Sequence, residues 1–275
     1  MKNLGAIRPV WTQSLGVVAR SPIYVLTLAA VAGLWGLGAY EWLWLPESSV
    51  WVLTLTVVWF LALVWIALAV LAGSAANASS VASVRDRQFR LRKILNFEKR
   101  RLGRTFLVVL AGTLLYLVLG AVFGWLDAHA LNVGSFLTFQ LQNPVSSVII
   151  ASILWFVEAI IWIIYAGFVI TWLLEYSSPP QAMVPRNARQ TLAQSVSLSV
   201  FLTSLLSLFV FGGLVWGLAT SRPVFKPGAW DYAQFLARNG IALLLVTIGW
   251  LFWVLALARL ATPAVTAPTG SPPVA

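Results

Sequence analysis

The chain has 275 residues, of which 60% are hydrophobic and only 9% are charged. A water-soluble fold of this length could not bury so much apolar surface, so the composition excludes an ordinary soluble protein and predicts an integral membrane protein. The net charge of +10 is explained by basic residues that flank membrane spans, and no nucleic-acid partner is expected.

The first 20 residues are expected to form an N-terminal cytoplasmic segment that contains a short interfacial helix. Apolar residues recur there at spacings of three or four, a pattern typical of a helix lying in the headgroup region. These residues are Leu4, Ile7, Trp11, Leu15 and Val18.

Six apolar stretches follow, and each approaches or exceeds the length of about 20 residues that a membrane-spanning helix needs. We therefore expect an all-α fold with a six-helix transmembrane domain over residues 21–260. Residues 261–275 are rich in Pro, Thr and Ala and are expected to form a disordered cytoplasmic tail. The predicted spans are residues 22–40, 50–72, 105–126, 145–174, 196–219 and 241–260.

The basic residues beside these spans predict the orientation, because Lys and Arg are retained on the cytoplasmic side of a membrane. Six crossings place most of them on one side, and the exceptions are Arg222, Lys226 and Arg238. Both termini are therefore expected in the cytoplasm, in a multi-pass protein of a cell membrane such as the bacterial cytoplasmic membrane.

The densest positive charge lies in the predicted cytoplasmic loop between the second and third spans, residues 73–104. Residues 73–80 are small and polar and predict a flexible approach. Ser83 with Asp86 fits a capping box and Gly103 fits a helix stop, so a basic amphipathic helix is predicted between Ser83 and Gly103. It could lie on anionic lipid or dock a cytoplasmic protein. The residues predicted to make either contact are Arg87, Arg90, Arg92, Lys93, Arg100 and Arg101.

Polar residues inside the spans are the candidates for a functional site. Glu158 is the one ionisable carboxylate well away from a span end, where burying a charge costs several kcal/mol. It could contact an ion, a proton or a substrate, or it could be a neutral acid that bonds a neighbouring helix. Ser199, Thr203 and Ser207 share a helical face, with Ser204 beside them. These hydroxyls could line a polar path or hold helices together.

The sequence carries few signs of catalysis. It has one histidine, no cysteine and no glycine-rich phosphate loop. Thiolate metal sites and bis-histidine haem are therefore excluded, and the chain itself should not hydrolyse ATP. We expect neither an enzyme nor a bound metal or other cofactor.

The stretch Arg20-Ser21-Pro22-Ile23-Tyr24-Val25, which follows the predicted surface helix, resembles the start of the first span in ABC-2-type transport permeases. The order of the later segments is similar too. In that family a cytoplasmic segment after the second span contacts a separate ATPase, and residues 83–103 have that position here. Short external helices precede the sixth span of the family, where residues 223–240 lie.

Together these features predict a permease-like membrane subunit of a transport system, with any ATPase on a separate chain. The resemblance implies a homodimer or an assembly with other membrane subunits, while the basic loop predicts contact with anionic lipid headgroups. The alternative is a non-catalytic scaffold or accessory subunit of a larger membrane complex.

Overall fold

The computed structural model describes residues 4–43, 50–84, 88–91, 99–142, 146–177, 188–220 and 229–261. Six of its helical segments are long and apolar enough to cross a membrane, which confirms the predicted all-α, multi-pass architecture. The described helices are α1 (Leu4–Ala19), α2 (Pro22–Leu43), α3 (Val50–Val84), α5 (Lys99–Leu141), α6 (Ser147–Ser177), α7 (Ala188–Ser195), α8 (Leu198–Ser207), the π-helix η1 (Leu208–Gly212), α9 (Gly213–Thr220) and α10 (Ala229–Ala261).

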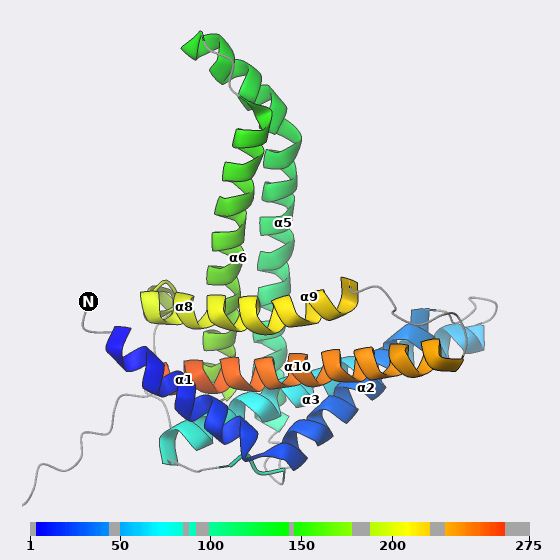
Figure 1. Ribbon diagram of the computed structural model, residues 1–275. Coiled ribbons are helices and arrows are strands. Elements are labelled where there is room, and N and C mark those ends of the chain that lie inside the picture. Colours follow the sequence, from blue (N-terminus) through cyan, green and yellow to red (C-terminus); the bar gives the residue numbers. More distant parts are fainter. Residues whose placement is uncertain are drawn as a thin grey trace, which may run out of the picture.

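The spans pair as three hairpins in chain order: α2 with α3, α5 with α6, and the continuous α8–η1–α9 segment with α10. The hairpins meet at one end of the molecule, which we call the base. The base comprises α1, Ser21 with the start of α2, the C-terminal part of α3, residues 88–91, the start of α5, the end of α6, α7, α8 and the C-terminal half of α10. From the base the hairpin α5–α6 runs in a different direction from α9 and α10 (Figure 1).

The C-terminal half of α10 is the centre of the base. Every residue from Leu251 to Ala258 is buried, so this part of the helix has neighbours on all sides. Its partners come from each hairpin, because α10 contacts α1, α2, α3, α6, α8 and α9. In the most apolar part of the α10 span 56% of the residues are buried, against 6% in α6. The hairpin α5–α6 therefore exposes most of its length.

Residues 73–84, which the sequence suggested as part of a loop, continue α3 into the base. Ser74, Ala75, Asn77 and Ala78 in this part of the helix have no exposed surface. The prediction of a flexible approach over residues 73–80 was wrong, because small residues also let helix backbones approach closely. Here they allow α3 to pack against α10.

The predicted continuous helix from Ser83 to Gly103 is also wrong. Residues 88–91 are not helical, and Gly103 lies inside α5 instead of ending a helix. The local capping and amphipathic pattern is overridden at residues 88–91 by contacts with the base. Residues 92–98 lie outside the described residues. The predicted tail over residues 261–275 lies outside them too, apart from Ala261, which ends α10.

Hydrogen bonds and a ring contact attach residues 88–91 to the rest of the base. The N–H of Phe89 donates to Ser21 Oγ at 3.0 Å, and its ring stacks on Tyr24 with centroids 5.0 Å apart. Asn77 Nδ2 donates to the carbonyl of Arg90 at 3.1 Å. The segment is thus held by α2 and α3 together.

The π-helix η1 corrects the register of the fifth span. Ser199, Thr203, Ser207 and Phe211 follow one another at intervals of four residues, and a regular α-helix would turn each about 40° past the last. The wider π turn takes up one extra residue. As a result Ser207 and Phe211 both face α10: Ser207 Oγ donates to the carbonyl of Gly249 at 3.3 Å, and the rings of Phe211 and Phe252 lie 5.8 Å apart.

Arg238 joins the outer ends of α9 and α10. Its Nε donates to the carbonyl of Leu218 at 3.1 Å, and its Nη2 donates to the carbonyl of Ala219 at 3.0 Å. Carbonyls in the last turn of a helix lack partners within that helix, and a positive charge is favourable beside them. Arg238, one of the three basic residues predicted on the opposite side from the others, therefore caps the C-terminal end of α9.

Gly249 should tolerate no side chain, because a Cβ at this position would lie 2.7 Å from Cβ and Cγ of Phe211. We predict that Gly249→Ala destabilises the protein by about 1–3 kcal/mol through overpacking. Gly36→Ala is the matched control, since nothing lies within 4 Å of a Cβ there. Unfolding temperatures in one detergent would check this, and equal temperatures for both variants would contradict the close contact of η1 with α10.

Candidate functional site

The hydroxyls predicted on the fifth span lie in the base, between α8 and its neighbours. Thr203 and Ser204 are fully buried, and Ser207 is 3% exposed. Trp11 of α1 donates from Nε1 to Thr203 Oγ1 at 3.0 Å, and Trp253 of α10 donates from Nε1 to Ser204 Oγ at 3.0 Å. We call these five residues, Thr203, Ser204, Ser207, Trp11 and Trp253, the hydroxyl seam.

The hydroxyl seam joins helices by direct hydrogen bonds. Its third contact is the bond from Ser207 to Gly249, and the neighbouring Trp250 donates from Nε1 to Ser74 Oγ of α3 at 3.0 Å. Interhelical hydrogen bonds of this kind contribute on average about 0.6 kcal/mol each in membrane proteins. Ser199 stands apart, because its hydroxyl lies 3.3 Å from that of Ser197 at the start of α8. This arrangement agrees with the packing interpretation of the serine stripe.

Glu158 lies on α6, outside the hydroxyl seam. Trp162, one turn along the same helix, donates from Nε1 to Glu158 Oε1 at 2.9 Å. Nine residues separate Glu158 from Gly167, where α6 packs on Val200 and Ser204 of α8, and nine residues correspond to about 14 Å of helix rise. The structure therefore does not unite Glu158 and the hydroxyls in one polar site.

An aromatic cluster surrounds the partner of Glu158. The ring of Trp162 lies 5.0 Å from Tyr116 and 5.9 Å from Phe123, both on α5, and 5.5 Å from Tyr165 in an edge-on arrangement. Tyr165 does not reach Glu158, because its hydroxyl donates to the carbonyl of Gly112 at 2.9 Å. These contacts fix the position of Trp162, and Trp162 in turn positions the carboxylate.

Indole N–H groups also join α2 and α3, which sequence reasoning missed. Trp35 donates to the carbonyl of Leu63 at 2.8 Å, Trp59 to that of Gly38 at 3.0 Å and Trp42 to that of Thr56 at 3.0 Å. The mid-span positions of Trp35 and Trp59 are the signal that could have predicted bonds between helices, since a buried indole N–H needs an acceptor.

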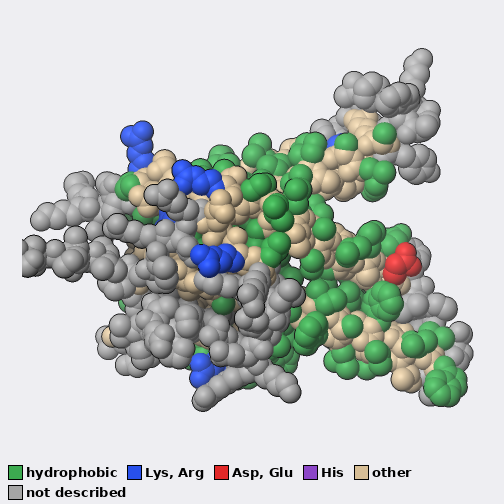
Figure 2. All heavy atoms as spheres, turned by 90° about the horizontal axis from the view of Figure 1, so that it is seen from below, with side chains coloured by type: hydrophobic (Ala, Val, Ile, Leu, Met, Phe, Trp, Pro, Cys, Tyr) green, Lys and Arg blue, Asp and Glu red, His purple; other side chains and the backbone are tan. Residues whose placement is uncertain are grey.

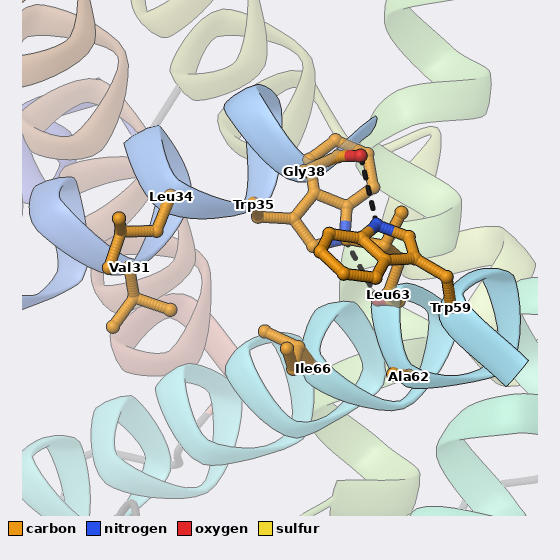
Figure 3. Close-up of a pocket in the computed structure, with 8 residues that line it drawn as sticks. All are labelled: Val31, Leu34, Trp35, Gly38, Trp59, Ala62, Leu63 and Ile66. Atoms are coloured by element: carbon orange, nitrogen blue, oxygen red, sulfur yellow. Dashed lines mark hydrogen bonds between the residues drawn. The ribbon is translucent and has the colours of Figure 1, made fainter. Parts of the chain in front are cut away.

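The Trp35 and Trp59 bonds border an apolar groove of about 470 Å³ between α2 and α3 (Figure 3). Both indole N–H groups point at backbone carbonyls, so they offer no donor to a ligand in the groove. Its lining has no titratable side chain and supplies no chemistry. The lining residues are Val31, Leu34, Trp35, Gly38, Trp59, Ala62, Leu63 and Ile66.

Basic side chains gather at the base in the described part of the chain (Figure 2). Among the residues predicted to contact a partner or lipid, Arg90 is exposed, whereas Arg100 and Arg101 belong to α5 without described side chains. Arg87, Arg92 and Lys93 lie outside the described residues. The structure adds three exposed cations that were not predicted to take part, namely Arg8, Arg20 and Arg104.

The described residues contain no group of three or more His, Cys, Asp or Glu side chains that could hold a metal ion. Comparisons with protein-family models, curated proteins and solved structures found no match. The resemblance to ABC-2-type permeases therefore stays a prediction from the sequence.

The bond between Trp253 and Ser204 should contribute measurably to stability. We predict that Ser204→Ala and Trp253→Phe are coupled by about 0.6–1.7 kcal/mol in a double-mutant cycle, the range found for hydrogen bonds between membrane helices. The control pairs Ser204→Ala with Trp216→Phe, because Trp216 is 72% exposed on α9. Additive effects of Ser204→Ala and Trp253→Phe on the free energy of unfolding would show that the seam does not stabilise the base.

Proposed function

We propose that the protein is a permease-like subunit of a membrane transport system, with any ATPase on a separate chain. The observation that carries this proposal is Glu158, a half-buried carboxylate far along α6 from the packed base. A carboxylate within a span is costly and usually serves a substrate, an ion or a proton. The hydroxyl seam needs no such group for packing.

The positive charge of the base supports the proposed orientation. Lys and Arg beside spans are retained in the cytoplasm, so the base would lie at the cytoplasmic surface with both termini. Exposed arginines there would attract anionic headgroups, each contributing about 1 kcal/mol near the membrane surface. Residues 88–91 would connect an ATPase that docks on this surface to α2 and α3 through Ser21, Tyr24 and Asn77.

The second candidate is an accessory or scaffold subunit without transport activity. The hydroxyl seam favours it, because Thr203, Ser204 and Ser207 are engaged in contacts between helices. Purification of the native complex separates the two functions. A nucleotide-binding subunit in that complex supports the transport system, whereas large integral proteins without one would support the scaffold.

Glu158→Gln tests the role of the carboxylate within that complex. Glutamine still accepts a bond from Trp162, so we predict normal assembly but about tenfold slower transport-coupled ATP hydrolysis, the effect of losing about 1.4 kcal/mol. Glu41→Gln is the control, since Glu41 is exposed at the end of α2. Unchanged hydrolysis in the Glu158→Gln complex would remove Glu158 from the transport pathway.

A further inference from the structure

We propose that Glu158 and the aromatic residues beside it bind the cationic group of a membrane-soluble organic cation. This inference rests on the proposed transport function and names the class of substrate that the site would take. The residues that form the site are Glu158, Trp155 and Trp162 on α6 and Tyr116 on α5.

No basic side chain stands near Glu158 along α5 or α6. Residues 105–141 of α5 and 147–177 of α6 contain neither Lys nor Arg. Within the part of the chain that the structure describes, the one hydrogen bond to the carboxyl group of Glu158 is donated by Trp162 to Oε1. A single neutral donor does not compensate an ionised carboxylate in a medium of low polarity. A cation that binds beside Glu158 would compensate the charge of the ionised carboxylate.

Aromatic rings border the carboxylate on both sides along α6. Trp155 lies three residues before Glu158 and Trp162 four residues after it, so all three share one helix face. Tyr116 extends this surface from α5 through its 5.0 Å contact with Trp162. Indole and phenol rings attract an organic cation through their faces, and the attraction is stronger when water is excluded.

The chemistry of the site selects the class of cation. A metal ion needs several oxygen ligands, and Glu158 is the one carboxylate here. A quaternary ammonium or phosphonium group needs no directed ligands, and its apolar substituents fit aromatic surroundings. The site is also open to the bilayer, because Trp155 is 70% exposed and Tyr116 is 51% exposed. A cation dissolved in the membrane could thus reach Glu158 without passing through the base.

Binding of tetraphenylphosphonium to the purified full-length protein in lipid nanodiscs tests the proposal. Tetraphenylborate is the control probe, because it has nearly the same shape and the opposite charge. We expect saturable binding of tetraphenylphosphonium that Glu158→Gln weakens at least tenfold and that Glu41→Gln leaves unchanged. Tetraphenylborate should show no saturable binding that depends on Glu158. Equal affinity of the wild type and Glu158→Gln for tetraphenylphosphonium would overturn the proposal.

Aromatic variants test the second half of the site. Trp155→Leu should weaken tetraphenylphosphonium binding several-fold, whereas Trp216→Leu, at an exposed indole on α9, should not. Equal effects of the two variants would show that the probe senses only apolar surface and would overturn the site. The proposed function can fail separately from the site. If tetraphenylphosphonium binding depended on Glu158 but the native complex had no ATPase and no transport activity, the site would stand and the transport function would be refuted.

Discussion

The burial of the C-terminal half of α10 on all sides is the constraint on which the rest of the structure depends. In a bilayer, apolar residues gain little by leaving lipid for another helix, so close packing and interhelical hydrogen bonds must hold spans together. Both are concentrated around Leu251–Ala258. Small residues of α3 approach the helix closely, and Trp250 and Trp253 donate to hydroxyls on α3 and α8. One helix thereby connects all three hairpins.

The base and the hairpin α5–α6 differ in the charged residues that they carry. The base carries the exposed arginines and the attached segment 88–91, while the hairpin α5–α6 extends beyond it and carries Glu158. The two polar features of the spans are correspondingly unlike. The hydroxyls of α8 engage other helices, whereas Glu158 is positioned by an indole of its own helix. The proposed function rests on Glu158 because the hydrogen bond to its carboxylate comes from its own helix and joins no second helix.

The sequence predicted the parts of this architecture that depend on the bilayer. Span number and helix content follow from the length of apolar stretches. Four of the six predicted spans lie within observed helical segments, and the other two, 145–174 and 196–219, begin two residues before α6 and α8. Features that depend on tertiary contacts were predicted wrongly. The loop composition of residues 73–80 did not reveal that α10 packs there, and the capping pattern at Ser83 did not reveal the contacts of Phe89 with Ser21 and Tyr24. Glu158 could be selected by its type and depth, but its separation from the serine stripe required the geometry.

The chain has no cysteine, so pairs of introduced cysteines can test most directly whether the hairpins are joined at the base. Gly167→Cys with Ser204→Cys should cross-link α6 to α8, because the two Cβ atoms would lie 4.0 Å apart, within the range for a disulfide. Trp155 and Trp216 each lie twelve residues further from the base on the same spans, and a cysteine pair there should stay reduced because the spans diverge. If the outer pair formed a disulfide, or if the inner pair did not, the hairpins could not be joined at the base and diverge beyond it.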